Sequence, residues 1–99
     1  MVNRIVVDRT IEFLKKMIHK AVVTIDNLDV EKEIESIEVV KDTIKAYVYL
    51  DGHGAVSKAK LIDVHGIELD NYESQISQNP NGLVIAFEWA LNLKGVTNL

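Results

Sequence analysis

A short motif, Asp-x-His-Gly, occurs twice in the chain, at Asp51–Gly54 and at Asp63–Gly66. In a strand, residues two apart point to the same face, so each motif would bring together a carboxylate and an imidazole that can share a metal ion or a proton. The motifs lie at opposite ends of a strand predicted for residues 55–64. Because a strand rises about 3.3 Å per residue, one metal ion cannot reach both motifs of a monomer unless the chain folds sharply between them. A partner chain is the other way to complete such a site.

Asp and Gly are also the residues that turns require for backbone reasons, and we favour turns at both motifs. We therefore predict no metal and no cofactor. The candidates for metal ligands are Asp51, His53, Asp63 and His65.

Catalytic motifs of other kinds are missing from the sequence. The chain has no Cys, which excludes thiol catalysis, thiolate metal sites and disulfides. No Ser lies in a Gly-x-Ser-x-Gly elbow, and no glycine-rich loop matches a phosphate-binding or dinucleotide-binding fingerprint. We expect a protein that is not an enzyme. The alternative is a small enzyme or ligand-binding module with a pocket between helix and sheet.

Three aromatic residues are candidates for an interface. Tyr47 and Tyr49 lie on the outer face of a predicted strand, where exposed aromatic pairs anchor protein contacts. A two-layer fold that covers both faces of the strand is the alternative. Trp89 lies among large apolar residues, so we favour a place in the core for it over a place in an interface.

One helix is predicted near the N-terminus, between a short strand at Arg4–Val7 and the β-strands that follow. Asp8 caps this helix, which extends from Arg9 to about Val22. Apolar residues recur along it at three- and four-residue steps and form one stripe, Ile11, Leu14, Met17, Ile18, Ala21 and Val22. Because residues 21–25 are mostly β-branched, the helix can give way to a strand there.

The middle of the chain is predicted to be mainly β. Asp26-Asn27 is typical of a turn. Residues 29–40 fit either a helix capped by Asp29 or a strand, and we favour the strand. From Thr43 onward the residues alternate with a period of two, and the inner set is Ile44, Ala46, Val48 and Leu50.

Glycine-containing turns divide the strands that follow. Residues 51–54 predict a hairpin whose return strand is residues 55–64. His65-Gly66 predicts a further turn before a strand over residues 67–72. The clearest turn of the chain is residues 79–82, where Pro precedes Asn-Gly.

Residues 83–94 predict one long final strand. Its odd positions carry the large apolar residues Leu83, Ile85, Phe87, Trp89, Leu91 and Leu93. Extended, the strand would be about 40 Å long, whereas a domain of this size has a radius of gyration of about 13 Å. The strand must bend strongly or project onto a partner subunit, so we expect a homo-oligomer.

Composition limits the class of protein. The 99 residues are 47% hydrophobic with one Pro, which predicts a single globular domain over residues 1–99. No apolar run is long enough for a membrane span, and Lys15, Lys16 and Lys20 interrupt any signal peptide. With the lack of Cys, this favours a cytoplasmic location.

The net charge of −4 argues against nucleic acid as a partner. The charge is unevenly placed, because residues 1–20 are basic and residues 26–38 strongly acidic. The acidic segment is either a solvated face or a site for a basic partner.

Two segments carry faint resemblances. Residues 71–76, with Gly82 and Phe87, resemble the C-terminal part of a family of small Bacillus proteins. The segment Ala55–Leu69 resembles repeating β-hairpins of phage tail proteins. Neither resemblance implies an active residue.

We predict an α+β fold in which an N-terminal amphipathic helix packs on a mostly antiparallel, five- or six-stranded meander sheet. The function expected first is a non-enzymatic interaction or structural protein that associates with itself or with another protein. The further alternative is an acidic, phage-type inhibitor or decoy that uses residues 29–38 to capture a basic partner.

Overall fold

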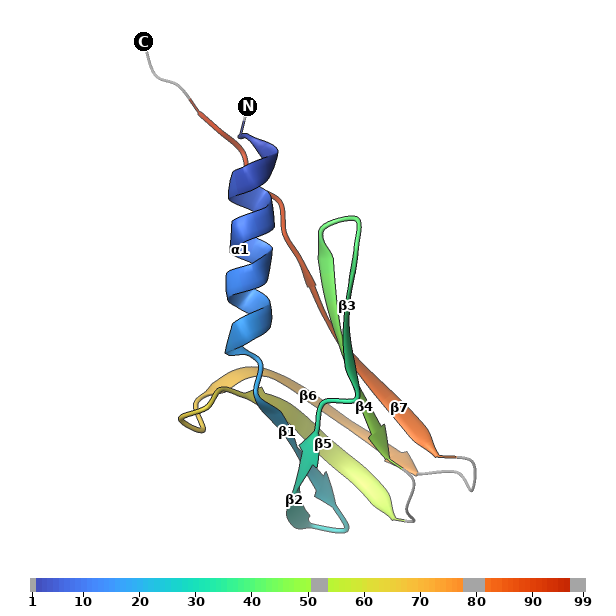
Figure 1. Ribbon diagram of the computed structural model, residues 1–99. Coiled ribbons are helices and arrows are strands. Elements are labelled where there is room, and N and C mark those ends of the chain that lie inside the picture. The colour runs from blue at the N-terminus through green and yellow to red at the C-terminus, as the bar shows by residue number, and fades with distance from the viewer. Residues whose placement is uncertain (1, 51–53, 78–81, 97–99) are drawn as a thin grey trace.

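The computed structural model describes residues 2–50, 54–77 and 82–96, and leaves aside the side chains of residues 74–77. One helix, α1 (Arg4–Met17), comes first along the chain (Figure 1). The strands that follow are β1 (Lys20–Ile25), β2 (Leu28–Glu33), β3 (Ser36–Val40), β4 (Thr43–Leu50), β5 (Ala55–Ile62), β6 (Glu68–Ser77) and β7 (Leu83–Ala90). The α+β class and the antiparallel pairing are confirmed.

The strands form two sheets, so the prediction of a single meander sheet was wrong. One sheet has the order β2-β1-β5-β6 and the other has the order β3-β4-β7. The hairpin predicted between β4 and β5 is wrong, because β5 pairs with β1 and β6 while β4 pairs with β3 and β7. Two stacked sheets bury the apolar faces of β4 and β5 against each other, which one short helix could not do for a single layer.

The helix begins earlier and ends earlier than predicted. It occupies residues 4–17 instead of 9–22, and the strand predicted at Arg4–Val7 is its first turn. Asp8 is not a cap but lies inside the helix, where its Oδ1 accepts a hydrogen bond from Nε of Arg4 at 2.8 Å. The β-branched run after Ala21 forms β1, as the sequence allowed.

Two hairpins have two-residue turns in the left-handed region of backbone space. Asp26 and Asn27, predicted as a turn, have φ of 50° and 66°. Lys41 and Asp42 connect β3 to β4 in the same way, with φ of 49° and 61°, and the sequence analysis did not identify this turn. The strand preference for residues 29–40 is confirmed by β2 and β3.

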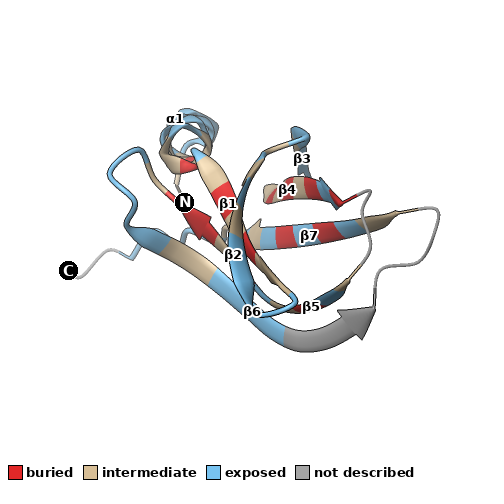
Figure 2. Ribbon diagram, turned by 90° about the horizontal axis from the view of Figure 1, so that it is seen from below, coloured by how far each residue is buried: buried red, intermediate tan, exposed pale blue. Residues whose placement is uncertain are grey.

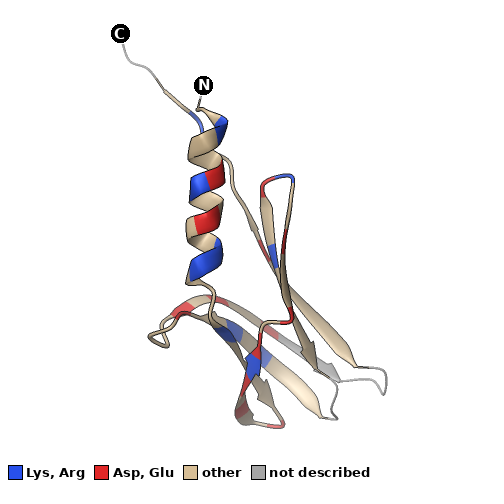
Figure 3. Cartoon of the chain, in the orientation of Figure 1, with Lys and Arg blue, Asp and Glu red and all other residues tan. Residues whose placement is uncertain are grey.

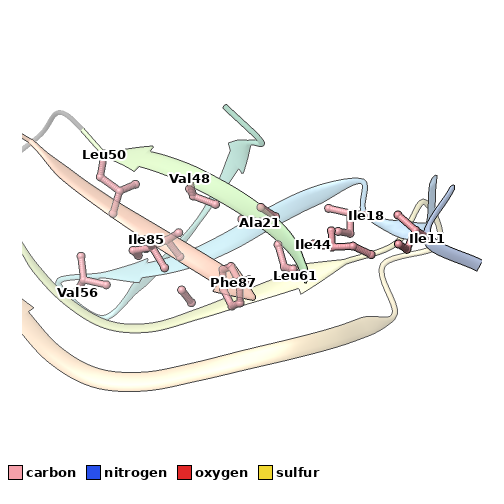
Figure 4. Close-up of a cluster of buried hydrophobic side chains, with 13 residues drawn as sticks. Ile11, Ile18, Ala21, Ile44, Val48, Leu50, Val56, Leu61, Ile85 and Phe87 are labelled. Carbon is pink, nitrogen blue, oxygen red and sulfur yellow. The ribbon is translucent and has the colours of Figure 1, made fainter. Parts of the chain in front are cut away.

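The core lies between the two sheets, and one end of it adjoins α1 (Figure 4). The predicted inner face of β4 is buried at all four positions, Ile44, Ala46, Val48 and Leu50. Opposite them are Val23 of β1 and Leu61 of β5, which have no exposed surface. Ile11 and Ile18 cover one end of this core, whereas Met17 of the predicted stripe does not belong to it.

The last strand is shorter than predicted. It ends at Ala90, and residues 91–96 continue outside any strand toward the N-terminal end of α1 (Figure 1). The backbone N–H of Leu91 still donates to the carbonyl of Asp42 at 3.0 Å. After Leu91 the last segment has no strand to pair with, because its partner β4 begins at Thr43 and the turn from β3 precedes that residue. The inward face of the odd positions is confirmed by Ile85 and Phe87.

The molecule is elongated, with extents of 58 × 27 × 20 Å and a radius of gyration of 16.1 Å. A compact chain of this length would have a radius of about 13 Å. The difference arises because α1 and the tip of the β3–β4 hairpin project from the sheets on the same side (Figure 1). The helix that the structure describes is neither long nor apolar enough to cross a membrane.

Candidate interaction surfaces

Asp63 and His65, the second predicted Asp-x-His-Gly pair, form a turn between β5 and β6. Oδ1 of Asp63 accepts hydrogen bonds from the backbone N–H groups of His65 and Ile67, both at 2.9 Å. The carboxylate therefore holds the backbone of the turn, as the turn interpretation predicted. The His65 side chain is exposed.

The other pair, Asp51 and His53, lies outside the described residues. Elsewhere in the chain, no three His, Asp or Glu side chains with known placement come together in a way that could hold a metal ion. Only one of the two motifs proposed for metal binding therefore lies within the described residues, and in that motif the Asp63 carboxylate accepts hydrogen bonds from the backbone of the turn.

Tyr47 and Tyr49 lie on the outer face of β4, as predicted. The hydroxyl of Tyr47 donates a hydrogen bond to Oε2 of Glu38 on the neighbouring strand at 3.0 Å. This bond, together with partial burial and the negative charges nearby, raises the pKa of Tyr47. Tyr49 is exposed, and its ring lies so close to Gly82 that a Cβ there would be 2.7 Å from the hydroxyl oxygen.

Trp89, the third predicted interface residue, is half-buried against the core. Its Nε1 donates a hydrogen bond to Oδ2 of Asp70 at 2.9 Å. Because Trp89 belongs to β7 and Asp70 to β6, this contact joins the two sheets.

The acidic residues of segment 26–38 lie mainly along β2 and β3 (Figure 3). On β2, Glu31 and Glu33 lie 3.6 Å and 3.5 Å from Nζ of Lys20, which partly neutralises them. Asp29 accepts a hydrogen bond from the hydroxyl of Thr24 at 2.6 Å. These carboxylates lie on β2, an edge strand, where charged side chains discourage pairing with other chains.

Helix α1 has a second apolar side, which we call the α1 outer face and define as Ile5, Val6 and Phe13. The core side of the helix buries Ile11 and rests Val7 and Leu14 on the core. All three residues of the α1 outer face are exposed instead, and Phe13 has 66% of its surface in solvent. Much of α1 is coloured as exposed in Figure 2. This face was not predicted from the sequence, because a helix that begins at Arg9 leaves Ile5 and Val6 in the preceding strand.

Among the described residues, the sheets line at least two grooves. The first, of about 220 Å³, lies on the outer face of the four-stranded sheet, and its lining includes Lys58, Lys60 and Asn71. The second, of about 180 Å³, lies between Tyr72 of β6 and residues 83–86 of β7. Neither groove is lined by a residue of α1.

No protein-family model matches the chain, and neither the curated proteins nor the solved structures include one that is similar to it. Its functional interpretation therefore begins with these surfaces.

Proposed function

We propose that this protein is a non-enzymatic interaction protein that associates with a second copy of itself through the α1 outer face. The observation that supports the proposal is the exposure of Phe13 with Ile5 and Val6 on a helix that projects from the sheets (Figure 1). Large apolar residues that are exposed on one side of a helix are candidates for an interaction site.

The spacing of these residues suits an antiparallel pairing of two α1 helices. Val6 and Phe13 are seven residues, or about two helical turns, apart and lie on the same side of the helix. In an antiparallel pair, Phe13 of each copy would pack against Val6 of the other. Such an arrangement is closed by a two-fold axis, which is the commonest symmetry of soluble oligomers.

Charge on the same side of the helix is complementary in this pairing. Arg9 lies between Val6 and Phe13 and forms no ion pair with any carboxylate that the structure describes. The antiparallel arrangement would bring Arg9 within about one turn of the partner's Glu12, twice per dimer. Glu12 is exposed, and its one ion pair among the described residues is with Nζ of Lys15 at 3.3 Å.

Light scattering after size-exclusion chromatography, over a range of protein concentrations, tests this proposal. We expect the wild-type protein to be dimeric at micromolar concentration and Phe13→Ser to be monomeric. Leu28→Ser is the matched control, because Leu28 is 69% exposed but lies at the start of β2. Its variant should remain dimeric.

A charge exchange gives an independent test of the orientation. Arg9→Glu and Glu12→Arg should each weaken the dimer, and the double variant should restore it. A wild-type protein that is monomeric at high micromolar concentration would refute the proposal.

A further inference from the structure

The free edge of β7 is a second surface, separate from α1. Strand β7 pairs with β4 on one side and with no other strand that the structure describes. The bond from the Leu91 N–H to the Asp42 carbonyl fixes the phase of the ladder, since bonded and non-bonded positions alternate in antiparallel pairs. The odd residues of β7 are therefore bonded to β4. The even residues, Val84, Ala86, Glu88 and Ala90, direct their N–H and C=O groups to the free edge.

This edge lacks the protection that the other edge strands carry. Strand β2 has four charged residues in six, β6 has Glu68, Asp70 and Glu73, and β3 is five residues long. Charge and short length both discourage pairing with other chains. In contrast, β7 has eight residues, no Lys and no Pro, and its one charge, Glu88, lies 3.8 Å from Nζ of Lys45.

An apolar groove accompanies the open backbone. The groove of about 180 Å³ lies between Tyr72 and residues 83–86, and Val84 at its side is 57% exposed. At the other end of β7, the hydrogen bond between Trp89 and Asp70 closes the space between the strands. Open backbone groups beside a pocket for side chains are the two features of sites that bind a peptide by strand addition.

We propose that β7 binds an extended, basic segment of a partner protein, which adds as a strand to the free edge between β7 and β6. The charge of the two bordering strands selects this occupant. Of the four carboxylates on β6 and β7, Glu88 lies beside Lys45 and Asp70 accepts a hydrogen bond from Trp89. The other two, Glu68 and Glu73, form no ion pair with any Lys or Arg that the structure describes. A segment that alternates apolar residues with Lys or Arg satisfies the backbone, the groove and the charge together.

Fluorescence anisotropy with the full-length protein tests the proposal. The probe is a labelled peptide that alternates Val and Lys over six residues, the length of β7 that precedes Trp89, with both ends blocked. We expect saturable binding of this peptide and no binding of the matched peptide that alternates Val and Glu. A third peptide has the Val/Lys sequence with alternate backbone nitrogens methylated. It should bind at least about tenfold more weakly than the unmethylated peptide, because it keeps the charge but loses the edge hydrogen bonds.

Substitutions locate the site. Val84→Lys places a cation on the free edge and should weaken binding of the Val/Lys peptide at least about tenfold. Val64→Lys makes the same change at a residue that is 69% exposed in the turn between β5 and β6, and should leave the affinity unchanged. Thermal unfolding of both variants verifies that they are folded.

Four outcomes overturn the proposal. Equal binding of the methylated peptide indicates attraction by charge alone. Equal weakening by Val84→Lys and Val64→Lys places the binding elsewhere. Absence of binding at millimolar peptide shows that the edge does not bind a basic segment. Self-association that Val84→Lys abolishes and Phe13→Ser does not shows that the edge binds a second copy of this chain instead. The proposal does not depend on α1, because Phe13→Ser should leave the affinity for the peptide unchanged.

Discussion

The indole Nε1 of Trp89 donates a hydrogen bond to Oδ2 of Asp70 across 2.9 Å, and this bond joins the last strand of one sheet to the last strand of the other. The two residues are partly buried, so the bond is formed where solvent competes less with it. It marks the position along β7 where the space beside the free edge closes.

Replacing Trp89 by Phe should therefore destabilise the fold. The variant keeps most of the apolar ring but leaves the Asp70 carboxylate without its donor, which costs about 1–3 kcal/mol. Urea unfolding monitored by circular dichroism measures the loss. In a double-mutant cycle with Asp70→Ala, the two changes should be less than additive; strict additivity would show that the bond does not couple the sheets.

Much of the strand content follows from local patterns in the sequence. The alternation from Ile44 to Leu50 predicted the buried face of β4, because side chains in a strand point to opposite faces in turn. The odd face of β7 followed from the same period. Asp26-Asn27 was predicted as a turn because Asn and Asp tolerate positive φ.

The partners of each strand could not be predicted in this way. A period of two says which side of a strand is buried but not which strand lies beside it, so β4 and β5 were assigned to one hairpin although they belong to different sheets. The contact between Asp70 and Trp89 has no local signal, because it depends on how the two sheets stack. The start of α1 was missed for a similar reason, since Arg4 contacts Asp42 at the tip of the β3–β4 hairpin.

Gly54 is a position where the backbone and the neighbours both require glycine. Its φ is +128°, and a Cβ there would lie 2.6 Å from Oδ2 of Asp26 and 2.7 Å from Cγ2 of Ile25. The carboxylate cannot move away without cost, because Oδ1 of Asp26 accepts a hydrogen bond from the N–H of Ala55 at 2.9 Å. Gly54→Ala should destabilise the protein by about 1–3 kcal/mol in urea unfolding.

Gly66 provides the control for this substitution. Its φ is also positive, at +79°, but a Cβ there meets no atom within 4 Å. Gly66→Ala introduces backbone strain without a steric clash and should cost less than Gly54→Ala. Equal losses in the two variants would show that the contact with Asp26 is relieved at no cost.

Arg4 and Asp42 form an ion pair that makes stability depend on acidic pH. Nη1 of Arg4 donates to Oδ2 of Asp42 at 2.9 Å, which connects α1 to the turn between β3 and β4. The hydrogen bond from the Arg4 guanidinium is the largest influence on the Asp42 carboxyl and holds its pKa below the ordinary value of 3.8, although desolvation opposes it. A carboxyl whose pKa is lower in the folded state stabilises that state above its unfolded pKa. This contribution is therefore complete above about pH 4 and is lost as the pH falls through the lower, folded pKa.

The expected result is a decrease in the free energy of unfolding of the wild-type protein below pH 4, and a shallower decrease for Asp42→Asn. Urea unfolding at a series of pH values measures both, and Asp42 contributes the difference between the two slopes. Arg4→Gln should reduce the slope in the same manner, because it removes the cation that lowers the pKa of Asp42. If Asp42→Asn leaves the slope of the wild-type protein unchanged, the pair does not connect the helix to the hairpin in solution.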